Sequence, residues 1–142
     1  MGASTHHVEL TFQFAPIPVA LGPEQWARGQ MPSGATVWLS SFASVPMQPA
    51  IRAGERMPIR GWISPRYGQR VAAPTLTYSG DAALPWRALT VLIPDRAGTP
   101  MPPVVHVIRD GRGRPFLLVF EATGEAVSVG EQTILVQGAS PL

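Results

Sequence analysis

Hydrophobic and polar residues alternate cleanly near the beginning of the chain. From residue 7 to residue 14, apolar side chains occupy every second position and polar side chains occupy the positions between them. The apolar set is Val8, Leu10, Phe12 and Phe14, and the polar set is His7, Glu9, Thr11 and Gln13. A period of two predicts a strand with one buried face and one exposed face. We expect this strand to end at residues 15–18, because the two prolines there cannot donate to a sheet ladder.

Short apolar runs separated by turn residues continue along the rest of the chain. The expected strands are residues 8–14, 19–21, 35–42, 57–63, 71–78, 84–93, 104–108, 116–120, 125–129 and 133–136. Turns are expected at residues 79–81 and 110–114, the second because Asp-Gly is a favoured hairpin pair. One strand for about every ten residues predicts an all-β fold. We expect a single domain over residues 1–142, an antiparallel β-sandwich of roughly nine to ten short strands without substantial helix.

Composition narrows the class of protein without naming a function. Hydrophobic residues make up 45% of the 142 positions and charged residues only 14%, which excludes intrinsic disorder. All 11 basic residues are arginines, yet the formal net charge is only +2, without the dense basic stripe of a nucleic-acid binder. The chain has no cysteine and therefore no thiolate metal site, and we expect neither a metal nor another cofactor.

Targeting signals are equally sparse. The first residues lack the charged and apolar regions of a signal peptide, and no run of 18 apolar residues could span a membrane. We therefore expect a soluble protein, either cytoplasmic or periplasmic, with no nucleic-acid or membrane partner.

The middle of the chain carries a more specific pattern. Residues 61–68 read Gly-Trp-Ile-Ser-Pro-Arg-Tyr-Gly, residues 71–76 read Val-Ala-Ala-Pro-Thr-Leu, and residues 84–94 read Leu-Pro-Trp-Arg-Ala-Leu-Thr-Val-Leu-Ile-Pro. This series closely resembles the C-terminal β-sandwich region of heparinase II/III-like polysaccharide lyases. The resemblance covers about residues 6–136, and the Ser-Pro-Arg-Tyr-Gly segment is its most specific part.

The resemblance implies an accessory module, non-catalytic or only partly site-forming, rather than a complete enzyme. In that family, an N-terminal α-toroid and a central sheet supply most of the residues that cleave uronate-containing glycans by β-elimination. A chain of 142 residues with an all-β pattern has no room for a toroid, so no catalytic or metal-binding residue is carried over. The implied partners are an acidic polysaccharide and an α-toroid catalytic domain or chain.

Arg66 and Tyr67 form the sharpest local candidate for catalysis. Elimination from a uronate needs a base for the C5 proton, and a cation beside a tyrosine favours the phenolate that could serve as one. The simpler interpretation is structural, with Pro65 fixing the backbone before a turn at Gly68. A single Arg-Tyr pair is not a catalytic constellation.

The remaining candidates concern binding. Arg109, Arg112 and Arg114 surround the expected hairpin turn, where they could contact a polyanionic glycan or simply be solvated. Trp26 lies in a polar loop and is the tryptophan most expected to be exposed for stacking on a sugar. His6, His7 and His106 show no metal-ligand spacing. Two alternatives remain open: a free-standing carbohydrate-binding module, and a structural or oligomerisation domain whose apolar edge pairs with another chain.

Overall fold

A computed structural model describes residues 4–138 and confirms the all-β fold. The outermost parts of the expected domain, residues 1–3 and 139–142, lie outside the described residues. The strands are β1 (Thr5–Gln13), β2 (Val19–Leu21), β3 (Ala27–Gln30), β4 (Thr36–Ala43), β5 (Gln48–Arg52), β6 (Glu55–Arg56), β7 (Ile59–Arg60), β8 (Trp62–Ile63), β9 (Val71–Ala72), β10 (Thr75–Ala83), β11 (Ala88–Asp95), β12 (Val105–Arg109), β13 (Pro115–Phe120), β14 (Ala126–Val129) and β15 (Ile134–Gln137). Only one helical turn is described, the 3₁₀ segment Pro23–Gln25. None of the described helical residues forms a segment long and apolar enough to cross a membrane.

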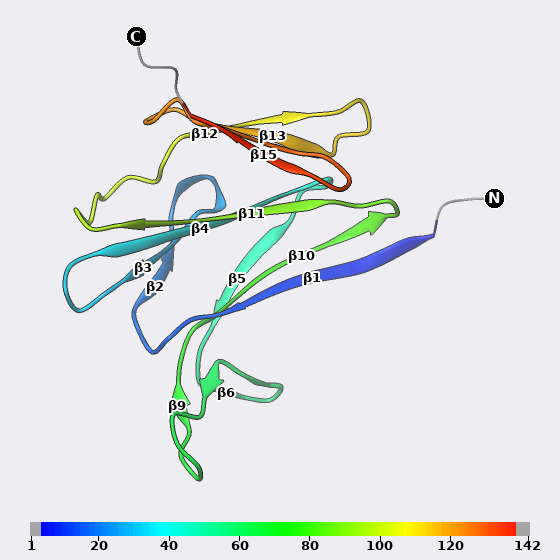
Figure 1. Ribbon diagram of the computed structural model, residues 1–142. Helices are drawn as coiled ribbons and strands as arrows, with labels where there is room; N and C mark the ends of the chain where they lie inside the picture. The colour runs from blue at the N-terminus through cyan, green and yellow to red at the C-terminus, as the bar shows by residue number, and fades with distance from the viewer. Residues whose placement is uncertain (1–3, 139–142) are drawn as a thin grey trace.

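The large strands form three stacked sheets, one more than a simple sandwich (Figure 1). One outer sheet has the order β1-β10-β5, the middle sheet β11-β4-β3-β2, and the other outer sheet β12-β13-β14-β15. All neighbouring strands run antiparallel. Stacking lets each sheet bury an apolar face against its neighbour.

The middle sheet buries both of its faces. Leu39 and Ala43 of β4 pack with Leu76 and Tyr78 of β10 in a first core. Trp38 of β4 points the other way, into a second core that contains Trp26, Val91 and Leu118. Seven of the eight β4 residues are consequently buried.

Several expected elements differ from the structure, and at two of them the packing around a glycine gives the reason. The strand expected at residues 57–63 is broken into β7 and β8, because the backbone of Gly61 has φ of +73° and its position leaves no space for a side chain. The turn expected at residues 79–81 is instead part of the continuous strand β10. Gly80 is required there by packing, since a Cβ at that position would lie 2.9 Å from Sδ of Met47.

Other strands begin or end away from their predicted limits. Strand β5 forms within the stretch expected to be irregular, and the strand expected at residues 84–93 begins only at Ala88. The predicted hairpin around Asp110 is confirmed as β12 and β13, whose turn is closed by a hydrogen bond from the amide of Asp110 to the carbonyl of Arg114.

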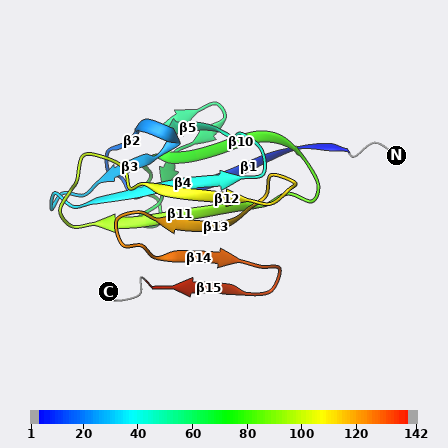
Figure 2. The same ribbon diagram turned by 90° about the horizontal axis from the view of Figure 1, so that it is seen from above.

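Two parts of the molecule extend beyond the three layers. The small hairpins β6–β7 and β8–β9 project below the β1-β10-β5 sheet in Figure 1. On the opposite side of the molecule, β14 and β15 reach sideways past the other sheets, with β15 outermost in Figure 2.

Candidate functional site

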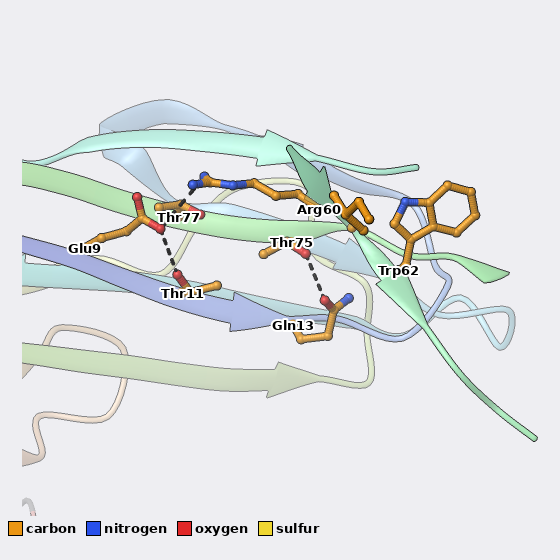
Figure 3. Close-up of a pocket in the computed structure, with 9 residues that line it drawn as sticks. Glu9, Thr11, Gln13, Arg60, Trp62, Thr75 and Thr77 are labelled. Atoms are coloured by element: carbon orange, nitrogen blue, oxygen red, sulfur yellow. Dashed lines mark hydrogen bonds and ion pairs between the residues drawn. The ribbon is translucent and has the colours of Figure 1, made fainter. Parts of the chain in front are cut away.

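A polar groove lies where the projecting hairpins meet the outer face of the β1-β10-β5 sheet (Figure 3). Its volume is about 300 Å³, at the lower end of the range for small-ligand sites. The sheet contributes alternate residues from two neighbouring strands, and the hairpin region contributes the opposite wall. The lining residues are Glu9, Thr11, Gln13, Thr75 and Thr77 from the sheet, and Ile59, Arg60, Gly61 and Trp62 from the hairpin region.

Strand register explains why the floor of the groove is polar. In the antiparallel pairing of β1 with β10, Thr11 lies opposite Thr77 and Gln13 lies opposite Thr75. Directly opposed residues of a sheet point to the same face, so the polar set of β1 joins a polar set of β10. The alternate positions, including Leu76 and Tyr78, point into the first core. The groove therefore has the apolar core directly beneath it.

Hydrogen bonds hold the amide and hydroxyl groups of this floor in place. The Thr75 hydroxyl donates to Oε1 of Gln13 over 2.8 Å. Nε2 of Gln13 in turn donates to the backbone carbonyls of Phe14, at 2.9 Å, and of Pro74, at 3.1 Å. The Thr11 hydroxyl donates to the Glu9 carboxylate over 3.4 Å. These groups are positioned before any ligand arrives, which lowers the entropic cost of binding.

One charged pair crosses the groove. Figure 3 shows the Arg60 side chain extending over Thr77 toward Glu9, and Nη1 of Arg60 lies 3.8 Å from the Glu9 carboxylate. Both side chains keep more than a third of their surface exposed, so the pair contributes little to stability. The Arg60 guanidinium is thus available to exchange Glu9 for an external carboxylate.

Trp62 is a fixed wall of the groove. Its Nε1 donates to the carbonyl of Glu55 over 2.7 Å, and the Arg70 guanidinium lies 4.2 Å from the ring centroid. The indole therefore supports the hairpins through a cation–π contact on one face of the ring.

The chain around the groove is strongly basic. Between residues 52 and 70 there are five arginines and one acidic residue. The arginines are Arg52, Arg56, Arg60, Arg66 and Arg70, and the acidic residue is Glu55. Glu55 is paired with Arg52 at 3.3 Å. Of these arginines, Arg60 lines the groove, and the net positive charge of the stretch favours an anionic ligand there.

The structure places the predicted Arg66–Tyr67 pair at the tip of the β8–β9 hairpin, outside the groove. The carbonyl of Arg66 accepts hydrogen bonds from the Ser64 hydroxyl, at 2.9 Å, and from the Gln69 amide, at 3.0 Å. These bonds close the turn that was expected at Gly68. The Tyr67 side chain is fully exposed, and among the described residues no hydrogen bond reaches its hydroxyl. Nothing in this geometry positions Tyr67 as a base.

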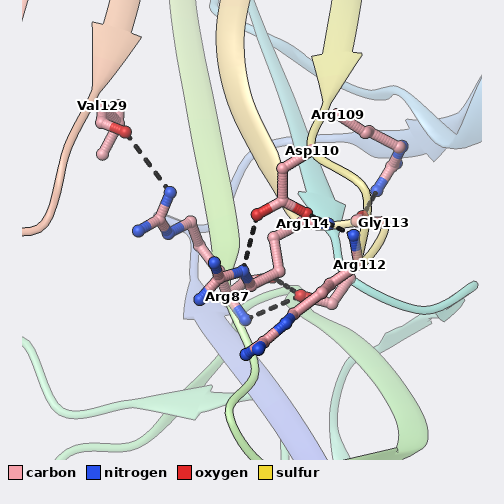
Figure 4. Close-up of polar contacts among 8 residues, drawn as sticks. Arg87, Arg109, Asp110, Arg112, Gly113, Arg114 and Val129 are labelled. Atoms are coloured by element: carbon pink, nitrogen blue, oxygen red, sulfur yellow. Dashed lines mark hydrogen bonds and ion pairs between the residues drawn. The ribbon is translucent and has the colours of Figure 1, made fainter.

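The predicted arginine turn is a separate site, at the β12–β13 hairpin of the other outer sheet, and Figure 4 shows its polar contacts. Asp110 organises it: Oδ1 accepts the amides of Arg112 and Arg114, each at 2.9 Å, and Oδ2 accepts Nε of Arg114 at 2.8 Å. The hydrogen bonds from Arg114, the backbone one first, lower the pKa of Asp110 from its usual value despite partial desolvation.

Two of the three predicted arginines in this turn have intramolecular roles. Arg109 donates to the carbonyls of Ala43 and Gly113, which fastens the turn to the end of β4. Arg114 pairs with Asp110, and the nearby Arg87 reaches toward the carbonyl of Val129 in Figure 4. Of the three, Arg112 alone has a guanidinium with no hydrogen bond to another described residue, so the turn offers a ligand fewer free cations than its sequence indicated.

The expectation that Trp26 is exposed is wrong. Its side chain is 2% exposed and packs in the second core, with its ring edge-on to Phe42 at a centroid distance of 6.0 Å. The residues before Trp26 form a polar loop, which suggested an exposed ring. Trp26 itself immediately precedes β3, where the chain enters the packed sheet. A buried ring has no face to offer a sugar.

The histidines do not form a metal site. His7 pairs with Asp81 at 3.0 Å, and His106 pairs with Glu121 at 2.8 Å. Within residues 4–138, no three His, Cys, Asp or Glu side chains lie close enough together to hold a metal ion.

The groove is a site that the sequence did not predict. The polar half of β1 was visible as an alternation, but its pairing with Thr75 and Thr77 joins positions about 60 residues apart, and periodicity does not report such a pairing. The best available signal was the second polar alternation, Thr75 and Thr77, beside a run of arginines. Comparisons of the chain with protein-family models, with curated proteins and with solved structures gave no significant match.

Proposed function

We propose that this domain is a non-catalytic β-sandwich module of a heparinase II/III-like polysaccharide lyase, and that it binds a uronate-containing glycan in the polar groove. The observation that carries the proposal is the composition of the groove. Hydroxyl, amide, carboxylate and guanidinium groups face one cavity of about 300 Å³. A uronate segment presents the complementary set, because its hydroxyls both donate and accept hydrogen bonds and its carboxylate pairs with arginine.

The sequence resemblance supports the same place. The Gly-Trp segment at the start of residues 61–68 supplies Gly61 and Trp62 of the groove wall. The Ala-Pro-Thr-Leu segment supplies Thr75 of the floor. Two of the three segments that resemble the lyases therefore meet at the groove.

Arg60 has the central role in the proposed binding. Its guanidinium pairs with the glycan carboxylate and leaves Glu9 to accept hydrogen bonds from sugar hydroxyls. Thr11, Gln13, Thr75 and Thr77 orient the sugar ring. The net positive charge of residues 52–70 attracts the polyanion, so affinity falls as salt is added.

The test measures binding of a soluble polyuronate and of the same polymer with its carboxyl groups reduced to alcohols, by calorimetry at low salt. We expect the acidic polymer to bind and the reduced polymer to bind much more weakly. Arg60→Ala should weaken binding roughly 10- to 100-fold, because a hydrogen bond to a charged group contributes about 1.5–3 kcal/mol. Arg112→Ala is the matched control, since it removes the same charge from a turn outside the groove.

Three outcomes would count against the proposal. Equal losses in Arg60→Ala and Arg112→Ala would mean that only total charge matters. Absence of binding to any polyuronate would rule out a uronate-containing glycan as the ligand. Release of unsaturated uronate by the isolated chain, followed by ultraviolet absorbance and abolished by Tyr67→Phe, would show that the domain is catalytic. An α-toroid coding sequence next to that of this chain would support the lyase assignment.

A further inference from the structure

Strand β15 leaves three large apolar side chains in water. Ile134, Leu135 and Val136 are 70%, 61% and 65% exposed. Figure 2 shows the reason, since β14 and β15 extend beyond the sheets that cover β12 and β13. Within residues 4–138, β15 pairs only with β14, so its outer backbone edge has no partner strand in the described part of the chain.

Two of these residues, Ile134 and Val136, lie on the face that the second core would continue. Leu118 of β13, which is buried in that core, lies opposite Val127 of β14, and Val127 lies opposite Val136 of β15. Opposed residues share a face, so Val136 and its alternate neighbour Ile134 belong to the face that packs on the middle sheet. They stand beyond the reach of that sheet.

The hydrogen-bonding pattern shows which residues of β15 present their backbone outward. The amide of Gly130 donates to the carbonyl of Thr133 over 2.8 Å, so these two residues close the β14–β15 hairpin as a hydrogen-bonded pair. Such pairs alternate along an antiparallel ladder, which directs the backbone of Leu135 toward β14 and the backbones of Ile134 and Val136 toward the free edge. Two N–H and two C=O groups are therefore available to another strand.

The edge carries none of the usual protection against strand pairing. Natural edge strands avoid association by means of lysine, proline, inward-pointing charges or bulges. Residues 133–137 read Thr-Ile-Leu-Val-Gln, with no charge and no proline. A neutral edge indicates no charged partner and does not repel an identical edge.

We propose that β15 pairs antiparallel with β15 of a second copy of this chain, about a two-fold axis at Leu135. This register places Ile134 opposite the second copy's Val136 in a hydrogen-bonded pair. The two-fold axis generates a second, identical pair between Val136 and the second copy's Ile134. The two Leu135 side chains then face each other across the axis. Four inter-chain backbone hydrogen bonds form, and the two outer sheets join into one continuous sheet of eight strands, four from each copy.

The contact is small, because each copy contributes one four-residue strand and the overhanging face beside it. Stable dimers bury roughly 800 Å² on each partner, so this pairing predicts a reversible equilibrium that depends on protein concentration. The experiment is sedimentation equilibrium of the full chain from micromolar concentrations to about 1 mM, the range in which weak association is measurable. A shift from monomer to dimer mass is expected, and a monomer throughout would overturn the proposal.

A charge-pairing experiment tests the register. Leu135→Lys and Leu135→Glu should each be monomeric where the wild-type chain dimerises, because like charges would meet at the axis. Mixing the two variants in equal amounts at low salt should restore the dimer. Dimerisation of either variant alone at the wild-type level, or a mixture that stays monomeric, would overturn the two-fold register.

A backbone variant separates pairing from hydrophobic contact. Val136→Pro removes an N–H that points to the free edge, a position at which a strand tolerates proline. It should abolish dimerisation without lowering the melting temperature of the monomer by more than a few degrees. Dimerisation equal to that of the wild-type chain would contradict strand pairing.

Polyuronate binding by Leu135→Lys should be unchanged, so the dimer and the glycan proposal are tested independently.

Discussion

Alkaline pH should destabilise this protein through one side chain, Tyr78. Its ring is fully buried in the first core, and its hydroxyl donates to the carbonyl of Gln25 over 2.7 Å, with the carbonyl of Leu39 at 3.4 Å. Burial raises the pKa of Tyr78 above its ordinary value of 10.0, and the neighbouring Ser40 hydroxyl only partly offsets this. A phenolate would lose the donated hydrogen bond and carry a charge into the core.

The sign and size of the effect follow from proton linkage. Above pH 10 the unfolded chain releases the Tyr78 proton while the folded chain still holds it, so the unfolded state binds one proton fewer. Stability therefore falls as pH rises, with a limiting slope of about 1.4 kcal/mol per pH unit for one proton. The stabilisation is fully present below the unfolded pKa and is lost as pH rises through the folded pKa.

The composition of the chain makes this slope unusually easy to assign. All 11 basic residues are arginines, which stay protonated, and the chain contains no cysteine and only two tyrosines. The free energy of unfolding is measured by urea titration with tryptophan fluorescence at successive pH values above 9. Tyr78→Phe should be less stable at pH 8 by about 1–3 kcal/mol, because buried carbonyls lose their donor, and should show little further loss above pH 10.

Tyr67→Phe is the matched control, since it changes the exposed tyrosine and leaves Tyr78 in place. It should keep the wild-type stability at pH 8 and the wild-type slope above pH 10. A slope that survives in Tyr78→Phe, or one that disappears in Tyr67→Phe, would refute the assignment to Tyr78.

Three further predictions concern the framework. Gly61→Ala places a Cβ 2.4 Å from Cα of Ala53 and should cost several kcal/mol by urea denaturation, whereas Gly68→Ala, which has a similar φ but open space, should cost only about 1–2 kcal/mol. Asp110→Asn should lower the melting temperature at pH 7 more than at pH 2. Folding lowers the pKa of the Asp110 carboxyl, so the ionised carboxylate stabilises the folded state above the usual pKa of 3.8, and this stabilisation is lost as pH falls through the folded pKa. Leu118→Ala should cost about 2–5 kcal/mol, and fluorescence and circular dichroism should still report one transition. Separate transitions would show that the third sheet unfolds independently.

Local sequence patterns predicted the fold class well, because a half-buried strand shows an alternation of apolar and polar residues and a tight turn shows characteristic residue pairs. The alternation around Val8 became β1, and the Asp-Gly pair became the β12–β13 turn. The predictions failed where a glycine serves a distant contact: Gly80 accommodates Met47, and nothing in its neighbourhood along the chain distinguishes it from a turn glycine. The third layer was missed for a related reason, since a strand buried on both faces does not alternate.

The candidate site was predictable only in part. The polar set of β1 was recognised, and the arginine turn was placed correctly as a turn. The chain alone did not indicate that Arg109 is used to hold Ala43, or that Arg60 crosses the sheet to Glu9. Exposure of Trp26 was inferred from polar neighbours, but a tryptophan at a loop end is drawn into the nearest core because its ring buries more apolar area than almost any other side chain.

The double burial of β4 has a consequence for how this protein tolerates change. In a two-layer sandwich, every second position of a strand faces water and accepts most substitutions. Residues 36–43 have no such permissive face, because one side serves the core of Tyr78 and the other the core of Leu118. A saturation library over this strand should show an unbroken block of intolerant positions, whereas β1, whose polar face borders the groove, should alternate between intolerant and tolerant positions.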